Sequence, residues 1–170
     1  GTIIFLPWIL KVFYGILGDK VGSKRFGRRR ILIIGMFSFA GLIFIIMGIP
    51  GFLTPQNAIN VFVFAGLLIF FGVSFADTIT DGLILDIVPK EKLGRTSGLT
   101  WGLRSVGAIA GGPIFAVLVV FGGFSISLVF IIVGIFMILS SLLTILINEP
   151  KEYPEVKLGL HLKQMLNNKR

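Results

Sequence analysis

The chain of 170 residues is 55% hydrophobic and 14% charged, with a formal net charge of +8. So few polar residues cannot coat a water-soluble globule of this length, which excludes that class and predicts a membrane protein. The cations cluster in short stretches between apolar runs, so we do not expect nucleic-acid binding. The absence of Cys excludes disulfides, thiolate catalysis and thiolate metal ligands.

Apolar segments that are long enough, or nearly so, to cross a bilayer follow one another along the chain. A helix needs about 20 residues to cross the hydrocarbon. Five segments meet this criterion: 2–18, 31–49, 58–88, 98–121 and 124–147. The third is too long for a simple crossing and is expected to extend beyond the bilayer. Because the runs are continuous, not alternating, they favour helices over barrel strands and predict an all-α membrane bundle over 1–149.

The polar tail, residues 150–170, follows the last apolar run. Apolar residues recur there at the spacing of an amphipathic helix, at Leu158, Leu162, Met165 and Leu166. Basic residues accompany them. We therefore expect an amphipathic cytoplasmic linker that contacts membrane lipid.

The distribution of Lys and Arg predicts the orientation. The loop after the first span holds six of these cations, the loop after the third holds three and the tail holds five, whereas the other two loops hold none. Basic loops stay in the cytoplasm, which places the N-terminus outside and the C-terminus inside. Because the chain begins within its first apolar run, we expect at least one earlier helix. The two remaining cations, Lys11 and Arg104, lie inside spans.

The first basic loop carries a recognisable motif. It reads Gly15-Ile-Leu-Gly-Asp19-Lys20 and, after six further residues, Gly27-Arg28-Arg29-Arg30. This motif resembles the loop signature of the major facilitator superfamily, which joins the second and third of twelve helices. The segments Leu6–Gly15 and Asp77–Pro89 look like the corresponding helices of the folate–biopterin transporters and, more loosely, of the muropeptide permeases. The resemblance implies helices two to six of a larger bundle. The first helix and the C-terminal half-bundle of the same protein would then be its partners.

In that family, contacts around this loop close the cytoplasmic side of the carrier. The resemblance therefore implies a gate at Gly15, Asp19, Lys20, Gly27, Arg28, Arg29, Asp86 and Glu91. The acids Asp86 and Glu91 are offered by the next cytoplasmic loop, and we expect Asp86 to pair with Arg28 or Arg29. In the alternative interpretation, the cations only enforce topology and contact anionic lipid.

Charges within the spans predict a second cluster. Asp77 and Asp81 are four residues apart and share a helix face, whereas Asp86 faces elsewhere. Asp77 and Arg104 each lie 13 residues from the turn at Lys90–Glu91, so they should lie at one depth. The same count places Asp81 opposite Thr100. Lys11 is expected in this layer too, and Trp101, one turn from Arg104, is a candidate cavity residue.

This cluster has two interpretations. In one, its charges are structural ion pairs that neutralise each other. In the other, which we favour, Lys11 or Arg104 binds an anionic group of a substrate while Asp77 or Asp81 carries a proton.

The predicted function is secondary active transport of a small solute, with an anion favoured, by alternating access in the cell membrane. A proton or cation gradient would drive it. A non-transporting membrane subunit or assembly factor on the same fold is the alternative. The sequence contains no nucleophile–base pair, zinc pattern or phosphate loop, so we expect no enzyme, cofactor or metal site.

Overall fold

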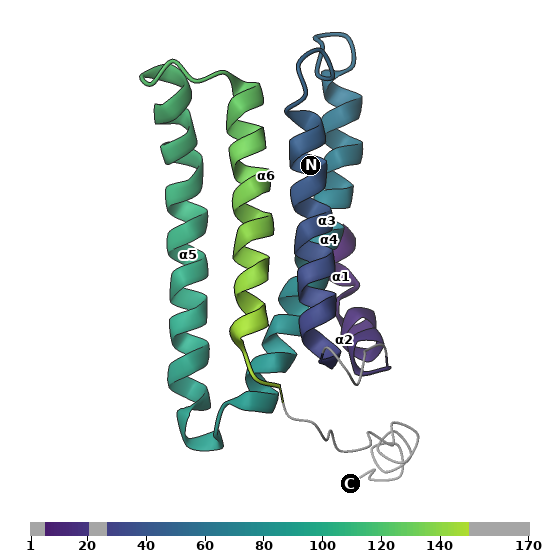
Figure 1. Cartoon of the computed structure of the whole chain (residues 1–170), viewed down its shortest axis with the longest axis vertical. Helices are drawn as coiled ribbons and strands as arrows, with labels where there is room; N and C mark the ends of the chain where they lie inside the picture. The colour runs from purple at the N-terminus through teal and green to yellow at the C-terminus, as the bar shows by residue number, and fades with distance from the viewer. Residues whose placement is uncertain (1–5, 21–26, 150–170) are drawn as a thin grey trace, which may run out of the picture.

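The computed structural model describes residues 6–20 and 27–149, and every regular element within these ranges is helical. In chain order the elements are α1 (Leu6–Ile9), α2 (Lys11–Lys20), α3 (Arg28–Met47), α4 (Ala58–Ile87), α5 (Lys90–Val120), α6 (Ile126–Leu142) and the 3₁₀ turn η2 (Leu143–Leu146). The four long helices run roughly alongside one another in Figure 1. The predicted tail helix lies outside the described residues.

Four helical segments are long and apolar enough to cross a membrane: Arg28–Met47, Ala58–Ile87, Lys90–Val120 and Ile126–Leu146. They confirm the predicted class of multi-pass helical membrane protein. The described part of the predicted first span differs, because it is divided at Leu10 into the short helices α1 and α2. Pro7 contributes here, since it has no N–H to donate and its carbonyl accepts from Leu10 in a tight turn. Five spans and their orientation remain a prediction.

Both α4 and α5 are longer than a simple crossing of the bilayer needs. α4 has 30 residues, on the order of 45 Å of helix against a hydrocarbon core of about 30 Å. α5 begins at Lys90, so the charged segment before the predicted span at residue 98 is helical as well. The turn at Val88–Pro89 separates the two helices, because the extended backbone of Val88 and the missing N–H of Pro89 end α4.

α3 is the central helix of the described bundle and packs against both α6 and α4. Gly41 of α3 and Gly134 of α6 lie face to face, and a Cβ on Gly41 would stand only 2.7 Å from the Gly134 carbonyl oxygen. The hydroxyls of Ser38 and Ser141 lie 3.3 Å apart in the same contact. Small residues thus allow α3 and α6 to approach closely.

The apolar core lies where α2, α3 and α4 meet. It consists of Tyr14, Ile33, Phe75, Ile79 and Leu83, all buried. The ring of Tyr14 packs edge-on against Phe71 and tilted against Phe75. This core fixes α2 against α4 at the level of the predicted charged cluster.

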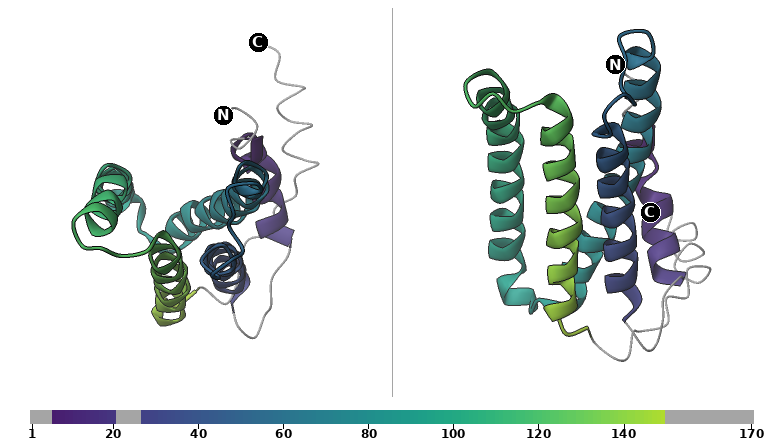
Figure 2. Two further views of the ribbon diagram at one scale, coloured as in Figure 1. Left: turned by 90° about the horizontal axis from the view of Figure 1, so that it is seen from above. Right: turned by 45° about the horizontal axis from the view of Figure 1, so that its top comes forward.

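α5 stands apart from this core. None of its residues is buried, and a Cβ on any of its glycines would meet nothing within 4 Å. Figure 2, seen from above, places α5 at the outer edge, beyond α6 and away from α3. The side chains of α5 that do reach α4 are therefore of particular interest.

Candidate functional site

Three helices bring charged side chains together in the second half of α4. Lys11 Nζ of α2 lies 2.5 Å from Asp77 Oδ2, and Arg104 Nη2 of α5 lies 2.5 Å from Asp77 Oδ1. The same Arg104 nitrogen donates a hydrogen bond of 2.9 Å to Asp81 Oδ1. We call Lys11, Asp77, Asp81 and Arg104 the inner network. Its two cations and two carboxylates give a formal charge of zero.

The structure brings Lys11, Asp77 and Arg104 together at the depth that residue counting gave. Asp81 joins them through Arg104, whose long side chain reaches two carboxylates one helical turn apart. Thr100, which the same count placed opposite Asp81, donates its hydroxyl to the Thr96 carbonyl at 2.9 Å.

Each cation of the inner network lies against a tryptophan three residues earlier in the chain. Lys11 Nζ is 4.1 Å from the Trp8 ring centroid, and Arg104 Cζ is 5.1 Å from that of Trp101. Both distances suit a cation–π interaction, and residues three apart on a helix share a face. Trp101 was predicted at this site, whereas Trp8 was not. The shared Trp-x-x-cation spacing is the signal that could have found it.

A second cluster joins the start of α3 to the end of α4. Arg29 Nε lies 2.7 Å from Asp86 Oδ2, so the partner of Asp86 is Arg29, one of the two predicted candidates. The Arg29 side chain lies across Gly82, one turn before Asp86, where a Cβ would overlap the guanidinium. Gly82 is therefore what gives Arg29 room to reach Asp86.

Sequence reasoning missed Glu149, which caps α3. Its carboxylate accepts from the backbone N–H groups of Arg28, Arg29 and Arg30 at 2.7, 3.2 and 2.5 Å, and its side chain is 2% exposed. These N–H groups have no partner within the helix, and the helix N-terminus attracts negative charge. The sequence feature that could have identified it is an acidic residue directly after the last span, on the predicted cytoplasmic side where the first basic loop also lies.

Arg30 strengthens the same junction. Its Nη1 donates to the carbonyls of Ile145 and Ile147, both at 2.9 Å, and so gives these carbonyl groups at the end of η2 a hydrogen-bond partner. Gly27 precedes α3 with a φ of +90°, and a Cβ there would lie 3.0 Å from the Glu149 carboxyl. We call Arg29, Asp86, Arg30 and Glu149 the end clamp, because it joins the ends of α3, α4 and α6.

The comparisons with known proteins bear on the whole chain. The model of the Major Facilitator Superfamily matches residues 1–169. The chain belongs to this superfamily. The resemblance found in the sequence is thereby confirmed.

Relatives in the superfamily are transporters by name. The chain is 31% identical over 167 residues to a folate-biopterin transporter of Synechocystis, covering 92% of this chain and 32% of that protein. It is 36% identical over 102 residues to putative transporters AmpG 1 of Rickettsia conorii and Rickettsia felis, covering 58% of this chain and 24% and 22% of theirs. The chain thus spans about a third or less of these relatives. No solved structure matches it significantly.

The remaining predicted gate residues divide into three groups. Gly15 lies opposite Thr78, where a Cβ would make an ordinary contact at 3.9 Å, so the packing of α2 on α4 does not require glycine there. Glu91 is exposed on α5 and takes part in no ion pair within the described ranges. The side chains of Asp19 and Lys20 lie outside the described part of the chain.

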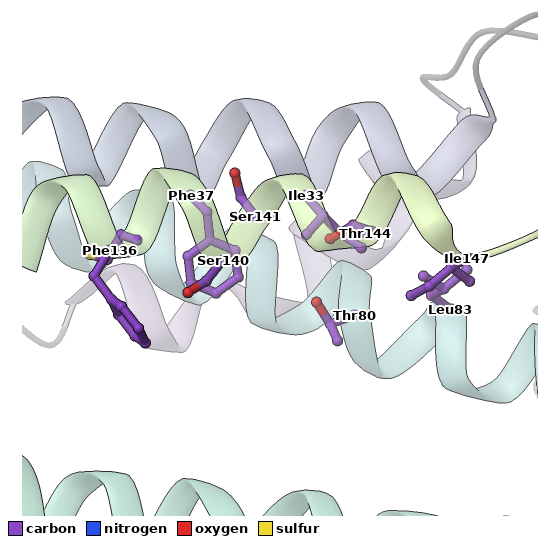
Figure 3. Close-up of a pocket in the computed structure, with 10 residues that line it drawn as sticks. Ile33, Phe37, Thr80, Leu83, Phe136, Ser140, Ser141, Thr144 and Ile147 are labelled. Atoms are coloured by element: carbon purple, nitrogen blue, oxygen red, sulfur yellow. The ribbon is translucent and has the colours of Figure 1, made fainter.

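A separate hollow of about 310 Å³ lies between α3, α4 and α6. Figure 3 shows Phe37, Thr80, Leu83 and Ser140 along it. Its lining is mainly apolar, and no member of the inner network belongs to it. The predicted charged site is therefore distinct from this hollow.

Proposed function

We propose that the protein containing this chain is a secondary active transporter of the cell membrane and not an enzyme. Membership of the superfamily and the names of the relatives support a role in transport. The observation that carries the proposal is the inner network. Ionisable side chains within membrane helices are costly and usually mark the pathway of a substrate or ion. Here four of them converge from three helices.

The proposed substrate is a small solute with an anionic group. Lys11 and Arg104 are the cations that such a group would contact, and Trp8 and Trp101 add flat aromatic surface beside them. The folate-biopterin transporter of Synechocystis makes folate a suitable first probe, because it combines carboxylates with a planar ring.

The proposed mechanism is alternating access coupled to a proton or another cation. Asp77 and Asp81 are the groups that can exchange a proton, and either Lys11 or Arg104 receives the substrate anion. The Arg29–Asp86 pair of the end clamp is the proposed gate, because it joins the start of α3 to the end of α4 on the side of the basic loop. Opening that side requires this pair to separate.

Folate accumulation by proteoliposomes with an imposed proton gradient tests this proposal, using the full-length protein. We expect gradient-dependent accumulation that falls at least roughly tenfold in Asp77→Asn and in Arg104→Ala, since each removes a charge-assisted contact of the network. Lys92→Gln and Arg95→Ala are the matched controls, because both residues are exposed on α5 and neither belongs to the predicted gate. Full accumulation in both network variants, or none in the wild-type protein, would contradict the proposal.

A further inference from the structure

The two carboxylates of the inner network are held differently. Asp77 is 10% exposed, and its two oxygens are each taken by a different cation, Lys11 and Arg104. Asp81 is 43% exposed and, among the described residues, contacts a single cation, through a nitrogen that Asp77 shares. Protonating Asp77 would therefore break two ion pairs, whereas protonating Asp81 would break one and leave Arg104 bound to Asp77.

The two cations also differ. Lys11 has one ammonium group, which donates to Asp77 and lies against Trp8. Arg104 has a second guanidinium nitrogen, Nη1, which is buried and donates to none of the described residues. A buried donor of this kind is costly unless it has a partner, and a guanidinium presents its donors in a fork that suits carboxylate or phosphate. Arg104 is thus the cation of the inner network with a buried donor that lacks a partner among the described residues.

From these differences we infer that Arg104 receives the anionic group of the solute and that Asp81, not Asp77, is the carboxylate that it releases to take up a proton. This inference rests on the proposed transport function and resolves the choices that it left open. One negative charge and one proton enter together, so the network stays neutral, which limits the cost of charge in the membrane interior. Asp77 keeps Lys11 and Arg104 in place throughout.

The charged groups around Asp81 support the same assignment. Arg104 faces it from α5, and Asp77 is its neighbour on α4. Lys11 of α2 is bound to Asp77, and Arg29 of α3, which lies across neighbouring Gly82, is bound to Asp86. Arg104 is therefore the cation whose release would free Asp81.

Infrared difference spectroscopy of the full-length protein in lipid tests the carboxylate without any substrate. On acidification we expect a protonated-carboxyl band that is lost in Asp81→Asn and kept in Asp77→Asn. Asp77→Glu, which preserves the charge, replaces Asp77→Asn if the latter does not fold. Glu91→Gln is the control for exposed acids. A band that survives in Asp81→Asn, that vanishes in the Asp77 variant, or that is absent from the wild-type protein would overturn the inference.

Folate is the probe for the anion. Its binding should be accompanied by proton uptake in the wild-type protein, and this uptake should be lost in Asp81→Asn while binding is retained. In Arg104→Gln the affinity should fall roughly tenfold to a hundredfold, as expected for loss of a charged hydrogen bond, and by more than in Lys11→Gln. The reverse order would overturn the choice of Arg104. If folate fails to bind the wild-type protein, the proposed substrate fails and the infrared experiment still decides the inference.

Discussion

The inner network and the end clamp both combine basic and acidic side chains, but their carboxylates are held in opposite ways. In the end clamp, three backbone N–H groups and a guanidinium surround the carboxylate of Glu149, whose side chain is 2% exposed. In the inner network, one nitrogen of Arg104 is shared between two carboxylates, and one of these is 43% exposed. A saturated, buried carboxylate holds helices together, whereas a shared and partly exposed one is suited to exchange its partner.

Glu149→Ala is expected to have the largest effect, because it removes the buried carboxylate of the end clamp. It leaves three helix N–H groups without their acceptor and removes the carboxylate that lies 3.9 Å from Arg30 Nε. Removing one partner of a buried ion pair costs about 3–5 kcal/mol. We expect a clear loss of stability in a thermal unfolding assay of the purified protein. Glu91→Ala, at an exposed acid, is the control and should unfold like the wild-type protein. Equal unfolding temperatures for the two variants would refute the capping role.

The next effect concerns Gly82, which gives Arg29 its route to Asp86. Gly82→Ala inserts a methyl group where the guanidinium lies, and such overpacking costs about 1–3 kcal/mol. Gly94→Ala is a matched control on α5, where nothing lies within 4 Å and alanine is the better helix former. Unfolding measurements should therefore show destabilisation for the first variant and none for the second. Equal stability of the two variants would mean that the Arg29 side chain can reach Asp86 without lying across residue 82.

The smallest expected effect concerns an uncharged contact, whose coupling energy can be compared with the energy of the charged contacts. Ser38 and Ser141 form a hydroxyl pair between α3 and α6 at 3.3 Å. A double-mutant cycle with both residues changed to alanine should yield a coupling of about 0.6 kcal/mol, typical of polar pairs between membrane helices. A coupling as large as the loss in Glu149→Ala would remove the distinction that we draw between charged and neutral contacts.

The sequence predicted contacts that follow from local geometry. Asp77 and Arg104 could be placed at one depth because antiparallel helices rise equally from their shared turn. The choice between Arg28 and Arg29 needed the exact start of α3, which Gly27 and Glu149 determine. Glu149 itself could not be placed, because it lies 120 residues from Arg29 and reaches it only through the packing of α3 on α6.

The loose packing of α5 has a mechanical consequence. With no buried residue of its own, α5 is joined to α4 by the turn at Val88–Pro89 and by the ionic contacts of Arg104. Those contacts lie about 21 Å along the helix from its start at Lys90. Under the proposed exchange, a change of partner at the Arg104 guanidinium would therefore act on a helix of 31 residues whose other connection to α4 is this turn.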